Sequence, residues 1–349
     1  MFANARVGFL LLLPLLCVSP LSAQQDGPLT PSASGRIYLD VVVTPKSGPP
    51  VAGLTQQDFT LLDNKAPQAI ATFQALGGSR DPVDVILVID AVNTGFQSIS
   101  FARDEIDKFL RIDGGHLAHP TALAFLTDTG VQIQDGFSSD GNQLVVSLDQ
   151  HTVGLRTIRR SAGFYGAAER YQLSLDAMNM ILTREAPRAG RKVIFWISPG
   201  WPFLSGPRVE VDSKQQQQIF DNIVRLSSQM QLARTTLYSV DPLGTADLAR
   251  TFYYKEFLKG VSKPSQAQPG DLGLEVLATQ SGGLALSTSN DVSSLLQQCL
   301  ADTQAYYEIS FDPPLADQRN AYHHLEIHLA NPKLIARTRQ GYYAQPGPH

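Results

Sequence analysis

Ser198 is the residue whose position most resembles that of a catalytic nucleophile. It follows the apolar run 193–197 and begins a turn with Pro199 and Gly200. A serine on a tight turn after a strand, activated by a histidine, is typical of hydrolases. Three histidines lie further along the chain: His323, His324 and His328. A Ser-dependent hydrolase that uses Ser198 is therefore one hypothesis for the function.

Two residues beside Ser198 argue against hydrolase chemistry. The glycine that begins a Gly-x-Ser-x-Gly turn is replaced by Trp196. The residue after the nucleophile should also donate its backbone N–H to the oxyanion, and Pro199 has no N–H to donate. We therefore expect that the chain is not an enzyme and that it has no catalytic residues.

The aromatic residues after this turn suit a different role. Trp201 and Phe203 follow the same predicted strand. Open α/β sheets bind ligands beyond the carboxyl ends of their strands, and aromatic side chains are frequent anchors in protein interfaces. The sequence therefore favours contact with a protein partner at this loop. Packing of both rings beneath their own loop stays open as the alternative.

The overall composition limits the class of partner. The chain has 349 residues and a formal net charge of −4, with 17% charged and 43% hydrophobic residues. No basic patch is visible in the sequence, so we expect no nucleic-acid partner. No Gly-x-Gly-x-x-Gly motif follows the first strand of the predicted sheet, which argues against a dinucleotide cofactor.

The first residues have the order of a secretory signal peptide. Arg6 supplies a positive charge, apolar residues follow it up to Val18, and small residues precede Ala23. The apolar stretch is shorter than the roughly 20 residues that a membrane-spanning helix needs. We therefore expect a signal peptide at 1–23 and a linker at 24–35. The rest of the chain is expected to be secreted or periplasmic, with no membrane span after signal removal.

Continuous apolar runs alternate with helical patterns in the middle of the chain. Such runs are typical of parallel strands buried on both faces, and apolar residues at three- and four-residue spacing are typical of helices. The predicted strands lie at 85–89, 122–126, 193–197 and 236–240, and the predicted helices include 171–182, 219–230 and 292–303. Residues 83–303 are thus predicted to form an α/β domain, with a Rossmann-like, mostly parallel sheet and helices on both faces.

Both ends of the chain beyond this domain have β-type patterns. The N-terminal candidate strands are 36–43, 58–62 and 69–73, and the C-terminal ones are 306–311, 322–329 and 334–343. Asp63, Asn64 and Lys65 signal a turn, so 69–73 is predicted to return as the second arm of a hairpin. We expect residues 36–76 and 306–343 to pack together as one small β-element beside the α/β domain.

Short motifs spread along the chain resemble those of a known family. They are Gly53-Leu54 with Asp58-Phe59, the run VILVIDAVNT at 85–94, the helix start Gly163-Phe164-Tyr165-Gly166, and Arg339-Gln340-Gly341-Tyr342-Tyr343. Their order is similar to that of the exported VWFA-related acidobacterial domain proteins, which contain a von Willebrand factor A-type (vWA) domain. The resemblance covers nearly all of the chain after the signal. It implies a vWA-type sheet and a binding role, and it names no ligand.

The resemblance also implies a metal site that has lost ligands. In the vWA family an Asp-x-Ser-x-Ser loop after the first strand takes part in a metal-ion adhesion site. Here Asp90 matches the Asp, Val92 stands at the first Ser and Thr94 at the second, while Ser198 and Pro199 stand where another Asp is expected. Asp90 and Thr94 alone make a poor site for a hard divalent cation. We therefore expect a degenerate site with weak or no Mg²⁺ binding, no other cofactor, and Asp90 bonded to loop amides.

Together these observations indicate an exported protein-binding module, of adhesion or scaffolding type. Its partner is expected to be a protein in the cell envelope or outside the cell. The candidate contact residues lie where the predicted strands end: Asp90, Asn93, Thr94, Ser198, Trp201 and Phe203. The Ser198 hydrolase remains the alternative.

Overall fold

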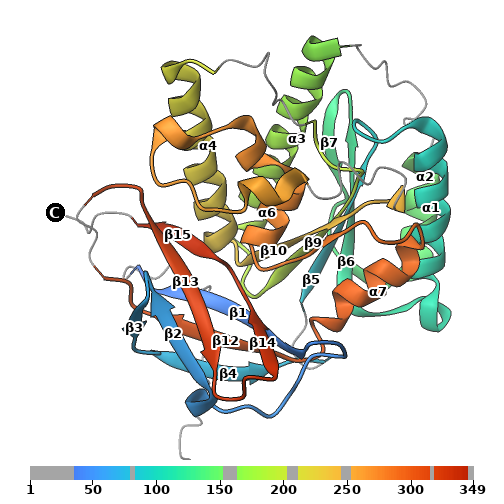
Figure 1. Ribbon diagram of the computed structural model, residues 1–349. Helices are drawn as coiled ribbons and strands as arrows, with labels where there is room; N and C mark the ends of the chain where they lie inside the picture. Colours follow the sequence, from blue (N-terminus) through green and yellow to red (C-terminus); the bar gives the residue numbers. More distant parts are fainter. Residues whose placement is uncertain are drawn as a thin grey trace, which may run out of the picture.

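The computed structural model describes residues 35–78, 83–151, 163–202, 211–244, 253–314 and 318–344. Within these ranges the chain forms an α/β unit and a β-sandwich that lies against one end of it (Figure 1). Strands from both ends of the chain build the sandwich, so the α/β unit is one long insertion between them.

A seven-stranded sheet organises the α/β unit. Its strand order is β11-β10-β9-β5-β6-β7, with β8 paired to β6. When the strands other than β8 are numbered in chain order and the sheet is read from β7, the order is 3-2-1-4-5-6, which is that of doubly wound sheets. The expected mostly parallel sheet is confirmed, but β7 and β8 run antiparallel to β6, which the sequence did not indicate. The strands are β5 (Asp84–Asp90), β6 (His116–Thr127), β7 (Gly130–Ile133), β8 (Ser138–Asp140), β9 (Lys192–Ile197), β10 (Thr235–Val240) and β11 (Ala285–Leu286).

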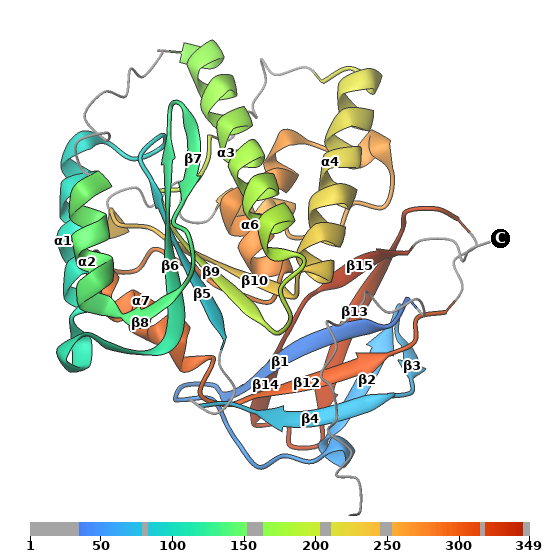
Figure 2. The same cartoon turned by 180° about the vertical axis from the view of Figure 1, so that it is seen from behind.

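Helices cover both faces of this sheet (Figures 1 and 2). β5 shows why, because its side chains alternate between the faces and both sets are apolar. Leu87 packs in one core with Ile106 and Leu296, whereas Val88 packs in the other with Met178. The helices are α1 (Phe96–Leu110), α2 (Gly141–His151), α3 (Gly163–Glu185), α4 (Ser213–Leu232), α6 (Leu274–Gln280) and α7 (Val292–Ala301), with short 3-10 helices η2 (Ile112–Gly115), η5 (Tyr254–Phe257), η6 (Pro264–Gln266) and η7 (Pro269–Leu272). In the described part of the chain, no helix has the length and apolar character to cross a membrane.

The β-sandwich packs two four-stranded sheets face to face. One has the order β14-β1-β12-β4 and the other β15-β13-β2-β3. Leu39 and Val41 of one sheet share a core with Leu61 and Leu325 of the other. The elements are β1 (Ile37–Pro45), η1 (Gln56–Asp58), β2 (Phe59–Asp63), β3 (Ala66–Gln68), β4 (Thr72–Leu76), β12 (Tyr306–Phe311), β13 (Ala321–Leu329), β14 (Leu334–Arg337) and β15 (Gly341–Ala344).

The hairpin after β2 returns earlier than the sequence predicted. Asn64 and Lys65 both have positive φ, at 48° and 69°, as a two-residue hairpin turn requires. The chain therefore returns at once as β3, which pairs with β2, and the predicted return strand at 69–73 is wrong. β4 belongs instead to the other sheet, where it pairs with β12.

The predicted single strand at 334–343 is also wrong. β14 pairs with β1, whereas β15 pairs with β13 in the opposite sheet. Between them Arg339 is buried, and the Gln340 N–H donates to the Gln280 carbonyl at the end of α6 at 3.0 Å. The β-strand is interrupted here because the chain crosses from one sheet to the other and contacts the α/β unit between them.

Charged residues join the sandwich to the edge of the sheet at which the parallel strands begin. Arg234, just before β10, lies 2.9 Å from Asp40 of β1 and 2.5 Å from Glu308 of β12. Arg191, just before β9, lies over the Tyr306 ring at 4.4 Å. The opposite edge, where the parallel strands end, is therefore not covered by the sandwich (Figure 2).

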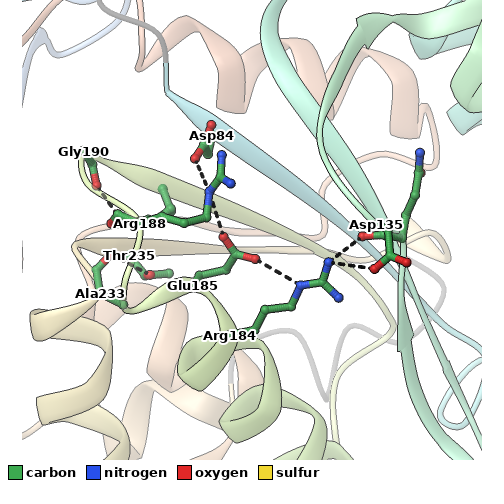
Figure 3. A network of polar contacts seen from close by, with 10 residues as sticks. Asp84, Asp135, Arg184, Glu185, Arg188, Gly190, Ala233 and Thr235 are labelled. Atoms are coloured by element: carbon green, nitrogen blue, oxygen red, sulfur yellow. Dashed lines mark hydrogen bonds and ion pairs between the residues drawn. The ribbon is translucent and has the colours of Figure 1, made fainter. Parts of the chain in front are cut away.

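A second network fixes the end of α3 against the start of β5 (Figure 3). Arg188 binds Asp84 at 2.9 Å and the buried Glu185 at 3.3 Å. Arg184 lies 3.7 Å from Glu185 and 3.3 Å from Asp135. A buried carboxylate needs such partners, since an unpaired one costs several kcal/mol. The network therefore positions α3, whose middle contacts the candidate site.

Candidate functional site

The candidate site lies where the neighbouring strands β5 and β9 end. These are the strands between which the order reverses, and loops leave a sheet in opposite directions at such a point. Val88 pairs with Trp196, and side chains alternate between faces along each strand. Asp90, Trp196 and Ser198 therefore lie on the same face, and their polar groups meet there.

Asp90 is fully buried, and its carboxylate accepts hydrogen bonds from four N–H groups. Oδ1 accepts from the backbone N–H of Val92 at 3.1 Å and of Asn93 at 2.9 Å. Oδ2 accepts from the Asn93 side-chain amide at 2.8 Å and from the Trp196 indole at 3.0 Å. A carboxylate has about four lone-pair positions, so these donors fill them.

The negative charge of Asp90 is thus balanced by N–H dipoles. Burial raises the pKa of Asp90 above its ordinary value, while hydrogen bonds from Asn93, Trp196 and Ser198 act to lower it. A divalent cation needs several oxygen ligands whose lone pairs are open to it. Because N–H donors occupy the lone pairs of Asp90 and Val92 is apolar, neither of these two positions offers such an ion a free ligand atom.

Two oxygen atoms next to Asp90 are buried with no hydrogen-bond partner in the part of the chain that the structure describes. They are Oδ1 of Asn93 and Oγ1 of Thr94. Asn93 is held through its amide nitrogen, which donates to Asp90 and, at 2.9 Å, to Oγ of Ser174 in α3. Leaving a buried polar atom unpaired costs roughly 1–3 kcal/mol, so this loop is not optimised for stability alone.

Exposed aromatic side chains stand at the starts of two helices around this site. Phe96, the first residue of α1, is 66% exposed, and Tyr165, in the first turn of α3, is 86% exposed. The N-cap of α1 is Gly95, so no side chain caps the first N–H groups of that helix. A Cβ atom at Gly95 would meet only open space. Exposed aromatic side chains around this edge, one of them beside the uncapped start of α1, form a surface suited to protein contact.

The three histidines proposed as a base for Ser198 all lie in the β-sandwich. Ser198 is fully buried, and its hydroxyl accepts a hydrogen bond from the Gly200 N–H at 3.2 Å. His323 lies on β13 in the sandwich, beyond the opposite edge of the sheet, where its Nδ1 contacts Asp63 at 2.8 Å. The other two candidate histidines are on the same strand. None of the three is within reach of Ser198.

Trp201 does not offer the exposed surface that we expected of a partner anchor. Its side chain is fully buried, and its ring packs edge to face on Trp196, with 5.2 Å between ring centroids. Gly200, with φ of 96°, lets the loop turn back over the end of β9. The burial that the alternative expects is what the structure has for Trp201, and its ring thereby supports Trp196. Phe203 lies outside the described residues.

The sequence alone does not single out Trp196, Ser174 or Phe96. Trp196 enters the sequence argument only as the residue that breaks a hydrolase turn. Strand alternation carries a usable signal, because residues 196 and 198 must share a face and Ser198 is predicted at the site. No such signal marks Ser174, since its contact with Asn93 depends on how α3 lies on the sheet.

No protein-family model and no curated protein sequence matches the chain. Among solved structures, it is similar to human COPII-coat protein Sec24c, at 10% identity over 76% of this chain and 44% of that chain, with a TM-score of 0.34. It is also similar to proximal thread matrix protein 1 from the mussel byssus (11%, 69% and 51%, TM-score 0.39) and to manganese-loaded Plasmodium vivax TRAP protein (9%, 80% and 100%, TM-score 0.36). The chain spans about half the length of the first two. All three TM-scores are below 0.5, too low to place the chain in a family.

Proposed function

We propose that this chain is an exported protein-binding module, of adhesion or scaffolding type, that holds its partner at the edge where β5 and β9 end. The partner is a protein in the cell envelope or outside the cell, and no divalent metal is needed to bind it. The motifs that resemble vWA proteins support the binding role, and the signal-like order of Arg6, apolar core and Ala23 supports export.

The observation that carries this proposal is the exposure of Phe96 directly after the Asp90 loop. A phenylalanine that is 66% exposed at the uncapped start of a helix has no role in the core. Aromatic side chains contribute a large share of the binding free energy in protein interfaces. Because N–H groups already satisfy Asp90, the partner meets this aromatic surface rather than a bound cation.

The test is retention of partner proteins by the immobilised chain in Mg²⁺ and in EDTA, using the envelope fraction of the source cells. We expect equal retention in both buffers. Phe96→Ala should weaken binding by about 2 kcal/mol, or roughly thirtyfold in Kd, as truncation of an interface anchor does.

Phe101→Ala is the matched control, because Phe101 is on the same helix and is 38% exposed, but it lies more than one turn further along. It should bind as the unchanged chain does. Retention that EDTA abolishes, or equal retention by the chain and by Phe96→Ala, contradicts the proposal.

A further inference from the structure

The chain passes between the sandwich and the α/β unit twice, and both crossings are fastened by one histidine. The first crossing leads from β4 to β5 and the second from α7 to β12. They are tied to each other by the Gly78 N–H, which donates to the Thr303 carbonyl at 3.1 Å. His119 of β6 is only 4% exposed and holds both. Its Nδ1 lies 3.3 Å from the backbone nitrogen of Val83, and its Nε2 lies 2.7 Å from Oγ1 of Thr303.

These contacts require a neutral imidazole with a defined proton position. The Val83 N–H can only donate, so Nδ1 of His119 must be the acceptor. The Thr303 hydroxyl donates its single proton to the Leu300 carbonyl at 2.7 Å. Nε2 must therefore carry the imidazole proton and donate it to the Thr303 oxygen. A second proton on His119 would point an N–H at the N–H of Val83.

The charged groups packed around His119 do not compensate a protonated ring. Burial, together with the positive charge of Arg191, lowers the pKa of His119 below its ordinary value. Asp302, next to the second crossing, is already paired with Arg337. Asp84, next to the first crossing, is paired at 2.9 Å with Arg188, which follows α3. Neither carboxylate is left to stabilise an imidazolium.

We infer that His119 is a pH-sensitive latch between the two units. In its neutral form it fastens both crossings, and its protonation releases them, so that the sandwich loosens from the α/β unit in acid. The latch lies at the edge of the sheet opposite Asp90. It is therefore independent of the proposed partner binding, and either can fail without the other.

The direction of the pH effect follows from linkage. In the opened junction His119 is in water and titrates near 6.5, whereas the closed junction binds that proton less readily. The stabilisation by the latch is complete above this value and is lost progressively as the pH falls below it. Opening therefore becomes more favourable at about pH 5 than at about pH 7.5.

Amide hydrogen exchange on the intact chain tests the latch. The protection of the Val83 and Gly78 N–H groups, corrected for the intrinsic pH dependence of exchange, is compared at about pH 7.5 and about pH 5. We expect protection to fall several-fold in acid. His119→Gln does not titrate in this range and should show low protection at both values. His116→Gln removes an exposed histidine of the same strand and should behave as the unchanged chain.

Protection that stays constant between the two pH values, or a pH dependence that persists in His119→Gln, overturns the inference. Thr303→Val is a second, milder variant, because it removes the acceptor of the Nε2–H bond and leaves the imidazole in place. It should lower protection at about pH 7.5 and reduce the pH dependence. Full protection of the Val83 N–H in this variant also overturns the inference.

Discussion

Replacing Asp90 and Trp196, singly and together, tests whether protein groups occupy the place of a metal ion. Asp90→Ala removes the acceptor of four N–H groups. Each buried N–H left unpaired costs roughly 1–3 kcal/mol, but water can enter the vacated space and removal of the buried charge is favourable. We expect the free energy of unfolding to fall by about 3 kcal/mol.

Trp196→Phe removes one donor from the Asp90 carboxylate and part of the ring contact with Trp201. A hydrogen bond to a charged group is worth about 1.5–3 kcal/mol, and an aromatic pair about 1 kcal/mol. The single variant should therefore lose about 3 kcal/mol. In the Asp90→Ala background only the ring contact remains to be lost, so the same change should cost about 1 kcal/mol. The expected coupling is about 2 kcal/mol.

The assay is urea unfolding followed by far-UV circular dichroism, for all four proteins, in Mg²⁺ and in EDTA. If Asp90 were a ligand of a bound metal ion, the effect of Asp90→Ala on the free energy of unfolding would depend on Mg²⁺, because metal binding stabilises the folded state. We expect the same values in both buffers. Additivity of the two changes to within about 0.5 kcal/mol would refute the assignment of Trp196 as a partner of Asp90.

Three further outcomes follow from the structure and the sequence. Burial raises the pKa of Asp271 to about 6, so the fold loses stability as the pH rises from about 4 to that value. Asp271→Asn should add up to about 3 kcal/mol to the free energy of unfolding at about pH 7.5 and nothing near about pH 3, and an unchanged stability in urea at the higher pH contradicts this. Ser198→Ala should keep partner binding and lose about 1 kcal/mol of stability, because the Gly200 N–H loses its acceptor; loss of a hydrolytic activity in this variant would favour the enzyme alternative. Mass spectrometry of chain recovered outside the cytoplasm should show cleavage near Ala23, and an intact Met1 terminus is the contrary result.

The parallel core of the fold was predictable because its signal is local. The runs around Val88, Ile194 and Leu237 are apolar on both faces. This pattern is typical of a parallel strand that helices cover on both sides. α1 was missed although Ile99, Ile106 and its other buried residues follow a helical spacing. β14 and β15 were read as one strand, since the sequence does not show that the chain changes sheets between them.

The site was predictable only in part. Strand ends locate Asp90 and Ser198, because the carboxyl ends of neighbouring parallel strands meet at one edge. The partners of Asp90 are harder to foresee. One of them, Trp196, lies on the neighbouring strand β9, one residue before its end, so the contact depends on the length of its side chain. Trp196 reaches because its indole is long, and its N–H then takes a lone pair of Asp90. Residue spacing alone does not distinguish that contact from ordinary core packing.

Isothermal titration calorimetry with Mg²⁺ and with Mn²⁺ tests most directly the claim that the Asp90 centre works without a metal. In the part of the chain that the structure describes, the Asp90 loop offers one carboxylate, whose lone pairs are occupied, so we expect the other groups of this loop not to offset the dehydration of a divalent ion. We expect no isotherm tighter than the millimolar range for either ion, and the same traces from the unchanged chain and from Asp90→Ala. A micromolar isotherm that disappears in Asp90→Ala would show that a cation displaces the Trp196 and Asn93 donors, and would contradict the account.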